Sequence, residues 1–338
     1  MNSSLSFLQT FIEEIRKFNN IKRKEVVFPL MDKVREDSFS SPNVFRGMGE
    51  DSAAVILNPS DPSEDTLVLI TTDGIDEDFS SKLPWSAGFC AIMVGIDDIY
   101  ACGGEAVAAS CIISSDDPKK RDELMKGLLD ATHRFKVPLV RGHTAENTKN
   151  VGVSATIIGK IKKENYISAG GAEPGDIIMI VADFDGKVGK STKYHWDTIT
   201  FKNSEELLKK RSVMNSIASQ HLAHASKDIS NGGIFGTMIL MLQYSQVGAE
   251  INLEQIKLPE LLIEMGYNEI DFSKMFLTTA FLLAIPQKNC RKVSELCEEH
   301  DMFFYQIGSI TENKMLTVTY KGERAELANI EDFIHEKK

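Results

Sequence analysis

The 338-residue sequence has few of the residues that build cysteine-dependent sites. Five cysteines are scattered along it without a CxxC pair: Cys90, Cys102, Cys111, Cys290 and Cys297. This spacing argues against a zinc site or a disulfide framework and favours buried, reduced thiols. We therefore expect a cytoplasmic location for the protein.

Positive charge and long apolar runs are also scarce. The chain has 38 Lys and Arg against 49 Asp and Glu, a formal net charge of -11, and no basic run. This charge repels polyanions and anionic lipids, so nucleic acids and membrane surfaces are poor partners. The apolar stretch 233–242 is too short to cross a bilayer. Residues 1–18 have helical apolar spacing interrupted by acids, which fits neither a signal peptide nor a membrane span.

The composition is that of an ordinary soluble protein, and its length predicts two domains. Apolar periodicity predicts mixed helices and strands in both halves. A glycine-rich turn at 169–176 separates the halves. We predict an α/β fold with a helical extension over 1–45, a first domain over 46–168 and a second over 169–338. Predicted strands cover 52–57, 66–73, 106–115, 137–142, 151–161, 177–184, 249–253, 276–285 and 303–310, and predicted helices cover 85–104, 119–135, 204–223, 235–245 and 291–300.

Acidic residues recur where the predicted elements end. Glu50 and Asp51 precede a strand in the segment GMGEDSAAVIL, Asp73 closes the next strand, and Asp97 and Asp98 end a helix. Carboxylates at element ends can converge on one point, where they repel each other unless a cation neutralises them. Mg²⁺ suits such oxygen ligands and bridges them to nucleotide phosphates. The alternative for each single aspartate is a helix cap or turn cap.

Two further segments have the composition of binding loops. RGHTAE, at 141–146, follows an apolar strand and presents the ring of His143 and the hydroxyl of Thr144 on a predicted loop. A hydrogen-bonded structural histidine is the alternative. KDISNGG, at 227–233, leads into an apolar helix whose free N–H groups would bind an anion. An Asn-Gly turn capping that helix is the alternative, and the P-loop spacing is missing.

A basic stretch, KVGKSTK at 187–193, is followed by Tyr194, His195, Trp196 and Asp197. It is either a mobile substrate loop or a solvated turn.

Six segments in order, GEDSAAV, LITTDG, VGIDDIYACGG, RGHTAE, GAEPGD and KDISNGG, resemble the AIR synthase-related proteins of the PurM-like ATP-binding superfamily. That superfamily includes AIR synthase, thiamine-monophosphate kinase, selenophosphate synthetase and a hydrogenase maturation protein. The resemblance runs from about Gly49 to the C-terminus. It implies two α/β domains, a homodimer whose N-terminal domains share a β-barrel, a C-terminal α/β sandwich, and ATP with Mg²⁺ between the domains.

The resemblance also implies roles for individual residues. The catalytic groups would be Asp51, Asp73, Asp98 and His143, and the metal ligands would be Glu50, Asp51, Asp73 and Asp98. The nucleotide would be contacted by Gly49, Asp51, Asp73, Asp98, Gly142, His143 and Thr144. The substrate or its phosphate would be contacted by Asp228, Asn231, Gly232 and Gly233.

Several departures separate this chain from each relative. Thiamine-monophosphate kinase has a GGDT-like segment where Gly142, His143 and Thr144 stand, and an aspartate in place of Asn231. The reactive N-terminal segment of selenophosphate synthetase and the TGIGTK-like segment of AIR synthase are both missing. The resemblance therefore implies a class of reaction but does not identify the substrate.

The leading hypothesis is a Mg²⁺-dependent enzyme that transfers the γ-phosphoryl group of ATP to an oxygen of a small molecule, as final product or to activate that molecule for a second step. Such catalysis needs positioning and charge neutralisation more than a nucleophile. The alternatives are a thiamine-monophosphate kinase-like phosphotransferase, a non-catalytic ATP-binding dimeric partner protein, and a metal-independent structural dimer.

Overall fold

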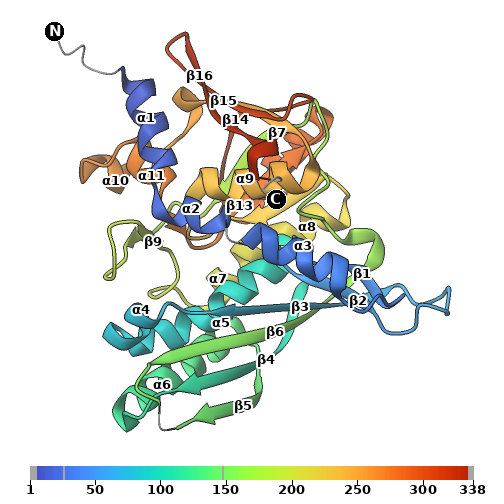
Figure 1. Cartoon of the computed structure of the whole chain (residues 1–338), viewed down its shortest axis with the longest axis vertical. Helices are drawn as coiled ribbons and strands as arrows, with labels where there is room; N and C mark the ends of the chain where they lie inside the picture. The colour runs from blue at the N-terminus through green and yellow to red at the C-terminus, as the bar shows by residue number, and fades with distance from the viewer. Residues whose placement is uncertain (1–5, 26, 147, 334–338) are drawn as a thin grey trace.

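The computed structural model describes residues 6–25, 27–146 and 148–333. A six-stranded sheet belongs to the first half of the chain and a seven-stranded sheet to the second, and helices pack against both (Figure 1). This architecture confirms the predicted two-domain α/β fold. The predicted boundary at 168/169 lies between β6, the last strand of the first sheet, and β7, the first strand of the second.

The first sheet has the strand order β1-β2-β3-β6-β4-β5. Its strands are β1 (Val44–Arg46), β2 (Ala53–Ile56), β3 (Thr66–Gly74), β4 (Glu105–Ser114), β5 (Leu139–Ala145) and β6 (Gly152–Lys162). All pairings are antiparallel except β4 with β5. Within one chain this sheet is open, and the barrel that the resemblance implies requires a second copy.

One face of the first sheet is covered by α5 (Pro84–Ala101) and α6 (Pro118–Phe135). Glycines let these helices approach closely. A Cβ on Gly88 would lie 2.0 Å from the carbonyl oxygen of Leu124, and one on Gly127 would lie 1.9 Å from that of Trp85. The opposite face carries exposed apolar side chains, including Ile70 and Ile112.

The second sheet has the order β10-β13-β7-β14-β11-β15-β16. Its strands are β7 (Ile177–Ala182), β10 (Ala225–Asp228), β11 (Gly248–Asn252), β13 (Ala280–Ile285), β14 (Phe303–Thr311), β15 (Met315–Tyr320) and β16 (Glu323–Asn329). Alternate residues of β7 enter two different cores: Ile178 and Ile180 pack in the core of α9 (Gly233–Ser245), whereas Met179 and Val181 pack in the core that contains the first domain. The second sheet is therefore the centre of a sandwich.

Helices α7 (Ser204–Arg211), α8 (Val213–Ser219) and α12 (Cys290–Glu299) contribute to the core shared with the first domain. The remaining short elements are α4 (Glu77–Lys82), α10 (Glu260–Glu264), α11 (Glu269–Ser273), β8 (Lys187–Val188), β9 (His195–Asp197) and β12 (Phe276–Leu277). Four 3-10 turns complete the described elements: 163–165, 253–255, 287–289 and 330–333.

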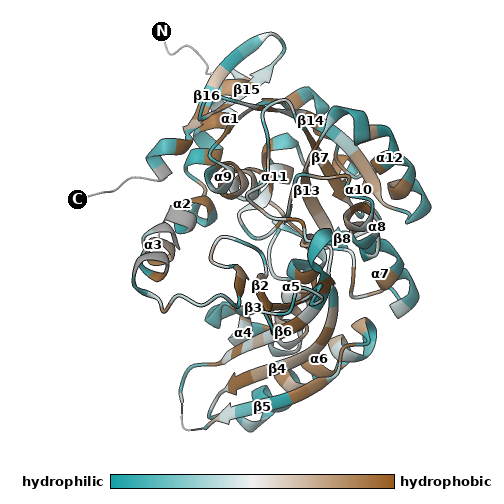
Figure 2. Cartoon of the chain, turned by 90° about the vertical axis from the view of Figure 1, so that its right-hand side faces the viewer, coloured by the Kyte–Doolittle hydropathy of each residue, from teal (hydrophilic) through white to brown (hydrophobic). Residues whose placement is uncertain are grey.

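The N-terminal extension packs on the second domain. It consists of α1 (Phe7–Arg16), α2 (Asn19–Glu25) and α3 (Val27–Asp37). Phe11 lies edge-on to Phe235 of α9, with ring centroids 5.2 Å apart, and the Nε of Arg16 donates to the carbonyl of Leu327 at 2.9 Å. Figure 1 shows blue α1 beside red β16, and in Figure 2, turned by 90°, α1 again lies beside β15 and β16. The two ends of the chain therefore build one domain.

Three local predictions are wrong. The helix predicted over 204–223 is two helices divided at Ser212, and the strand predicted over 276–285 is interrupted by Thr278 and Thr279, the latter with φ of 56°. Residues 143–145, predicted as a loop, lie within strand β5, which the prediction ended at 142. Among the described residues, no helix is both long and apolar enough to span a membrane.

Candidate active site at the domain junction

A cavity of about 880 Å³ lies between the domains and gathers half of the predicted site residues. Its lining includes Glu50, Asp51, Asp73, Asp98, Asp228 and Asn231. The other predicted residues do not line it: Gly49, Gly142, His143, Thr144, Gly232 and Gly233. The cavity is therefore the candidate site.

Three carboxylates converge in this cavity from distant parts of the chain. Asp51 lies before β2, Asp98 in the last turn of α5, and Asp228 at the end of β10. One oxygen from each lies within 4.8 Å of the others. Such a set of hard oxygen donors fits a divalent cation such as Mg²⁺. Asp73 lines the same cavity and shares a hydrogen-bond donor, the hydroxyl of Thr71, with Asp98.

Asp98 is buried among other acidic side chains. Burial, together with the charges of Asp228, Asp73 and Asp51, raises the pKa of Asp98 well above its ordinary value. The hydroxyl of Thr71 donates to its Oδ2 at 2.6 Å and partly opposes this effect. The cluster therefore gains stability whenever a cation reduces its net negative charge.

Lys227 supplies a buried cation that sequence reasoning missed. Its Nζ pairs with Oδ1 of Asp51, and the backbone N–H of Asp228 donates to Oδ2 at 3.1 Å. Burial alone would lower the pKa of Lys227, but the charges of Asp51 and Asp228 outweigh it and raise that pKa. The signal was its position beside Asp228 in KDIS.

The predicted metal role of Glu50 does not fit its contacts. Its carboxylate accepts from the hydroxyl of Ser168 at 2.8 Å and from the backbone N–H of Ala169 at 2.7 Å, and its side chain is fully buried. Glu50 is also absent from the three-carboxylate group found among the described residues. Burial raises the pKa of Glu50. The two adjacent acids thus divide their tasks: Glu50 holds the linker between the sheets, and Asp51 faces the cavity.

Asp97 and Asp98 divide in the same way. Asp97 pairs with Arg211 of α7, with 2.7 Å between Oδ1 and Nε, and both side chains are almost completely buried. The backbone N–H of Thr279 also approaches Oδ2 of Asp97, at 3.4 Å. Successive helix residues point about 100° apart, so Asp97 joins the domains while Asp98 reaches the cavity.

The predicted nucleotide residues of β5 lie elsewhere. The sheet order places β6 and β4 between β3, which carries Asp73, and β5. Gly142, His143 and Thr144 are exposed on that edge strand. Their predicted contact with a nucleotide therefore requires a surface beyond this chain's own cavity. Gly49 has φ of 111° and turns the chain just before Glu50.

The glycine pair before α9 serves packing. Gly233 has φ of 66°, and a Cβ there would lie 2.1 Å from the carbonyl oxygen of Ser273. The N–H of Gly233 donates to the carbonyl of Ser230 at 2.9 Å, so the expectation of a free donor is wrong at this position. Ser230 and Asn231 line the cavity instead.

A second group of lining residues comes from the basic segment at 187–195, from β12 and from helix α2. Tyr194, His195 and Phe276 line the cavity, as do Asn20 and Arg23 of α2. The rings of His195 and Phe276 stack, with centroids 5.5 Å apart. Among the described residues, the buried Nε2 of His195 has no hydrogen-bond partner, and burial lowers the pKa of this ring. Burial therefore favours the neutral imidazole.

The extension is fastened to this part of the cavity by specific contacts. Phe18 lies edge-on to Tyr194 with centroids 5.7 Å apart, and the side-chain amide of Asn20 donates to the carbonyl of Asn231 at 2.9 Å. The helices that begin the chain therefore help to shape the cavity, which the sequence motifs did not indicate.

Comparisons with known proteins agree with this arrangement. The chain matches the AIR synthase related protein N-terminal domain over residues 49–161 and the corresponding C-terminal domain over 173–321. An uncharacterized protein of Methanocaldococcus jannaschii is 29% identical, covering 95% of this chain and 96% of its own length. Thiamine-monophosphate kinase of Buchnera aphidicola (subsp. Schizaphis graminum) is 24% identical, covering 66% of this chain and 70% of its own length.

Solved structures share the fold. ThiL complexed with AMPPCP and TMP gives a TM-score of 0.63 at 21% identity, covering 88% of this chain and 94% of that one. PurL of Thermotoga maritima complexed with ATP gives 0.68 at 15% identity, covering 80% of this chain, which spans less than half (44%) of PurL. With both domains matched in order and the two-domain fold shared, this chain belongs to the AIR synthase related protein family.

Proposed function

We propose that this protein is a Mg²⁺-dependent, ATP-using enzyme that transfers the γ-phosphoryl group to an oxygen of a small molecule. The observation that carries the proposal is the convergence of Asp51, Asp98 and Asp228 in a cavity between two domains. Relatives and structural neighbours are named as a kinase and as ATP-bound or AMPPCP-bound proteins. In this proposal the transferred group becomes either the product's phosphate or a leaving group for a second step.

The three aspartates and Asp73 would hold Mg²⁺, which would neutralise phosphate charge. Phosphoryl transfer asks mainly for positioning and charge stabilisation. The chain's own part is to fix Asp98 through the Thr71 hydroxyl and Asp51 through Lys227 and the Asp228 amide. These bonds aim the carboxylate oxygens at one point.

The acceptor molecule would lie against the wall of His195, Phe276 and Asn20. The unpartnered Nε2 of His195 offers one hydrogen bond to an acceptor hydroxyl or amide. Arg23 and Lys190 also line the cavity. They would bind anionic groups of the nucleotide or acceptor.

The proposed homodimer uses the open face of the first sheet. Ile70, Val107, Ile112 and Val140 leave 36–66% of their surface exposed on this sheet. Exposed apolar clusters of this kind mark protein interfaces. In such a dimer, the predicted contact of His143 with a nucleotide would have to be made to the nucleotide bound by the partner protomer.

The direct test is nucleotide binding followed by turnover. We expect Mg²⁺ and ATP together to raise the melting temperature, because a ligand at about 100 times its Kd adds about 2.7 kcal/mol. Asp51→Asn and Asp228→Asn should abolish that rise. Wild-type protein that shows no shift with ATP and Mg²⁺ would refute the proposal.

A thiamine-monophosphate kinase-like activity is the second candidate, favoured by the similarity to the Buchnera enzyme. Asn231 replaces the aspartate expected of that enzyme and lines the cavity. A coupled assay with thiamine phosphate and ATP decides it: absence of ADP release removes this candidate while leaving ATP binding intact. A non-catalytic ATP-binding partner would instead show the thermal shift with no turnover on any acceptor.

A further inference from the structure

Thr279 is a buried residue in a backbone conformation that threonine rarely adopts. Its φ is 56°, in the left-handed region, and it is 0% exposed. The branched Cβ makes this conformation unfavourable, and such outliers persist only where the surrounding structure holds them. The other described non-glycine residues with positive φ are all exposed, and they lie at helix ends or in turns: Lys136, His221, Gln246, Asp301 and Lys321. Thr279 therefore needs a different explanation.

The kink at Thr278 and Thr279 takes the chain from one sheet into another. Before it, β12 pairs with β9 and places Phe276 opposite His195; after it, β13 pairs with β7 and β10 of the seven-stranded sheet. A straight strand over 276–285 would continue along the larger sheet and would separate Phe276 from His195. Both of these rings line the cavity, and they stack on each other. The kink therefore builds one wall of the candidate site.

The same kink contacts both neighbours of the carboxylate cluster. The N–H of Ile229, the residue after Asp228, donates to the carbonyl of the first residue of β13 at 2.9 Å. The N–H of Thr279 donates to Oδ2 of Asp97, the residue before Asp98, at 3.4 Å. Two members of the cluster are thus one residue away from a hydrogen bond at the kink.

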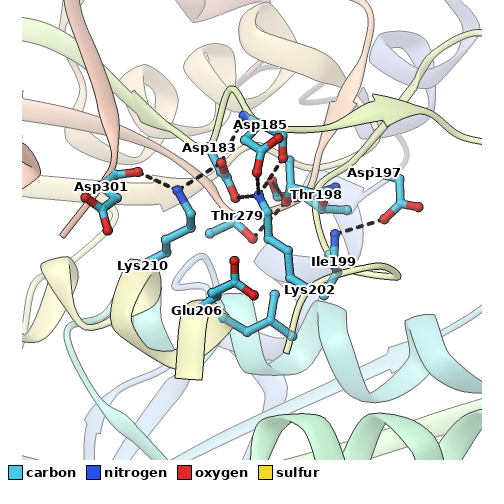
Figure 3. A network of polar contacts seen from close by, with 12 residues as sticks. Asp183, Asp185, Asp197, Thr198, Ile199, Lys202, Glu206, Lys210, Thr279 and Asp301 are labelled. Atoms are coloured by element: carbon cyan, nitrogen blue, oxygen red, sulfur yellow. Dashed lines mark hydrogen bonds and ion pairs between the residues drawn. The ribbon is translucent and has the colours of Figure 1, made fainter. Parts of the chain in front are cut away.

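The carbonyl and the hydroxyl of Thr279 anchor it. Its carbonyl accepts from the backbone N–H of Asp183 at 3.0 Å, and its hydroxyl oxygen accepts from the hydroxyl of Thr198 at 3.2 Å. Figure 3 shows Thr279 beside Thr198 and Asp183, where Asp183 pairs with the buried Lys202. Thr198 directly follows β9, so the hydroxyl contact joins the kink to that strand. A glycine would adopt this φ without strain, but it would lose the hydroxyl.

We propose that Thr279 is a positioning residue of the candidate site, whose anchored left-handed backbone fixes the wall of Phe276 and His195 relative to the carboxylate cluster before any ligand binds. This inference rests on the proposed function for the roles of the wall and the cluster. Site groups that are already fixed bind more tightly, because the ligand does not have to order them. Thr279 does not line the cavity, so it acts through its neighbours.

The test compares the full-length wild type with Thr279→Gly, Thr279→Ser and Lys136→Gly. Lys136 also has φ of 56°, but it is exposed at the end of α6 and does not line the cavity, so its replacement makes the same backbone change away from the site. Isothermal titration calorimetry, at a temperature where all variants are folded, measures the binding of ATP with Mg²⁺. Thr279→Gly should bind at least about tenfold more weakly, as is typical when residues that orient metal ligands are replaced. Thr279→Ser keeps the hydroxyl and should bind as wild type does, as should Lys136→Gly.

A second measurement needs no ligand. Trp196 lies on β9, is 1% exposed and is one of only two tryptophans in the sequence. In a Trp85→Phe background, acrylamide should quench the fluorescence of Trp196 more strongly in Thr279→Gly than in the parent, because β9 is held less firmly. Lys136→Gly should show the quenching of the parent.

Unchanged ATP affinity in Thr279→Gly would overturn the inference whatever the quenching, and so would an equal loss of affinity in Lys136→Gly. If Thr279→Gly does not fold, Thr279→Ala carries the same expectations, since it also removes the hydroxyl. A wild type that binds no ATP with Mg²⁺ would refute the proposed function. The quenching of Trp196 would then decide the inference, and equal quenching in the parent and Thr279→Gly would overturn it.

Discussion

Replacing Asp98 with asparagine should stabilise the ligand-free protein and weaken its response to Mg²⁺ and ATP. Asp98 is buried, and its carboxylate lies within 4.8 Å of those of Asp51 and Asp228. Two unit charges at this distance of 4.8 Å repel by about 3.5 kcal/mol at an effective dielectric constant of about 20. Asp51 and Asp228 both repel Asp98, Asp73 adds a third repulsion, and the ammonium of Lys227 offsets about one of them.

The net penalty for ionised Asp98 is therefore at least about 3 kcal/mol. Partial protonation, which its raised pKa indicates, relieves some of it. We expect Asp98→Asn to gain about 1–2 kcal/mol without ligand, which raises the melting temperature by a few degrees, at about 2–4 °C per kcal/mol. The asparagine oxygen can still accept the Thr71 hydrogen bond, so the loss of charge is the main change.

The neighbouring residue is the matched control. Asp97→Asn removes the partner of Arg211, whose side chain is completely buried, so this variant should lose about 3–5 kcal/mol without ligand. Its metal cluster is intact, so the rise in melting temperature with Mg²⁺ and ATP should persist. Two adjacent and isosteric substitutions thus have opposite expected signs.

Differential scanning fluorimetry of both variants, with and without Mg²⁺ and ATP, measures all four quantities. Wild type at about 100 times its Kd should gain about 2.7 kcal/mol, whereas Asp98→Asn should gain less than about half of this if ligand affinity falls by tenfold or more. A lower ligand-free melting temperature for Asp98→Asn, or an undiminished ligand response, would show that the three carboxylates do not repel or do not bind the metal.

Three further predictions concern other parts of the molecule. Because burial lowers the pKa of His195, the unfolded chain takes up a proton below about pH 6.5 that the folded chain does not, so stability falls as the pH drops. Urea titrations should show a smaller loss between pH 7.5 and 5.5 for His195→Gln, and an equal loss would contradict this cause. Ile112→Glu should convert a dimer into a monomer of 37.6 kDa by light scattering, whereas Ile263→Glu on α10 should leave the dimer unchanged; a wild-type monomer would rule out the interface. Gly233→Ala should lower the free energy of unfolding by about 1–3 kcal/mol in urea titrations, because an alanine would have to adopt φ of 66° and its Cβ would clash with the carbonyl oxygen of Ser273. Unchanged stability would mean that the turn relaxes freely.

Whether a segment is a helix or a strand was largely predictable, because the spacing of apolar residues along it reflects which of its faces is buried. The predicted helix over 119–135 is α6, and the predicted strand over 151–161 is β6 within one residue at each end. Docking of α1 was not predictable. Its apolar face is explicit in the sequence, but the partner, around Phe235 and Leu327, is more than 200 residues away and leaves no local signal.

The acids at element ends were the useful signal for the site. Asp51, Asp73 and Asp98 do line one cavity, and Asp228, assigned to a phosphate, joins the same cluster. Lys227 was missed because KDISNGG was interpreted as a glycine segment leading into a helix, and no strand was predicted there. Residues 225–228 instead form strand β10, and the Nζ of Lys227 pairs with Asp51.

Each pair of adjacent acids couples the domain junction to the cavity. In Glu50 and Asp51, the first carboxylate accepts hydrogen bonds from Ser168 and Ala169, and the second belongs to the three-carboxylate cluster. In Asp97 and Asp98 the same division recurs across α5. In both pairs, one backbone step separates a residue that joins the domains from a residue of the carboxylate cluster, so the junction contacts and the cluster lie side by side in the structure. Asp97→Asn and Asp98→Asn therefore test the two tasks separately.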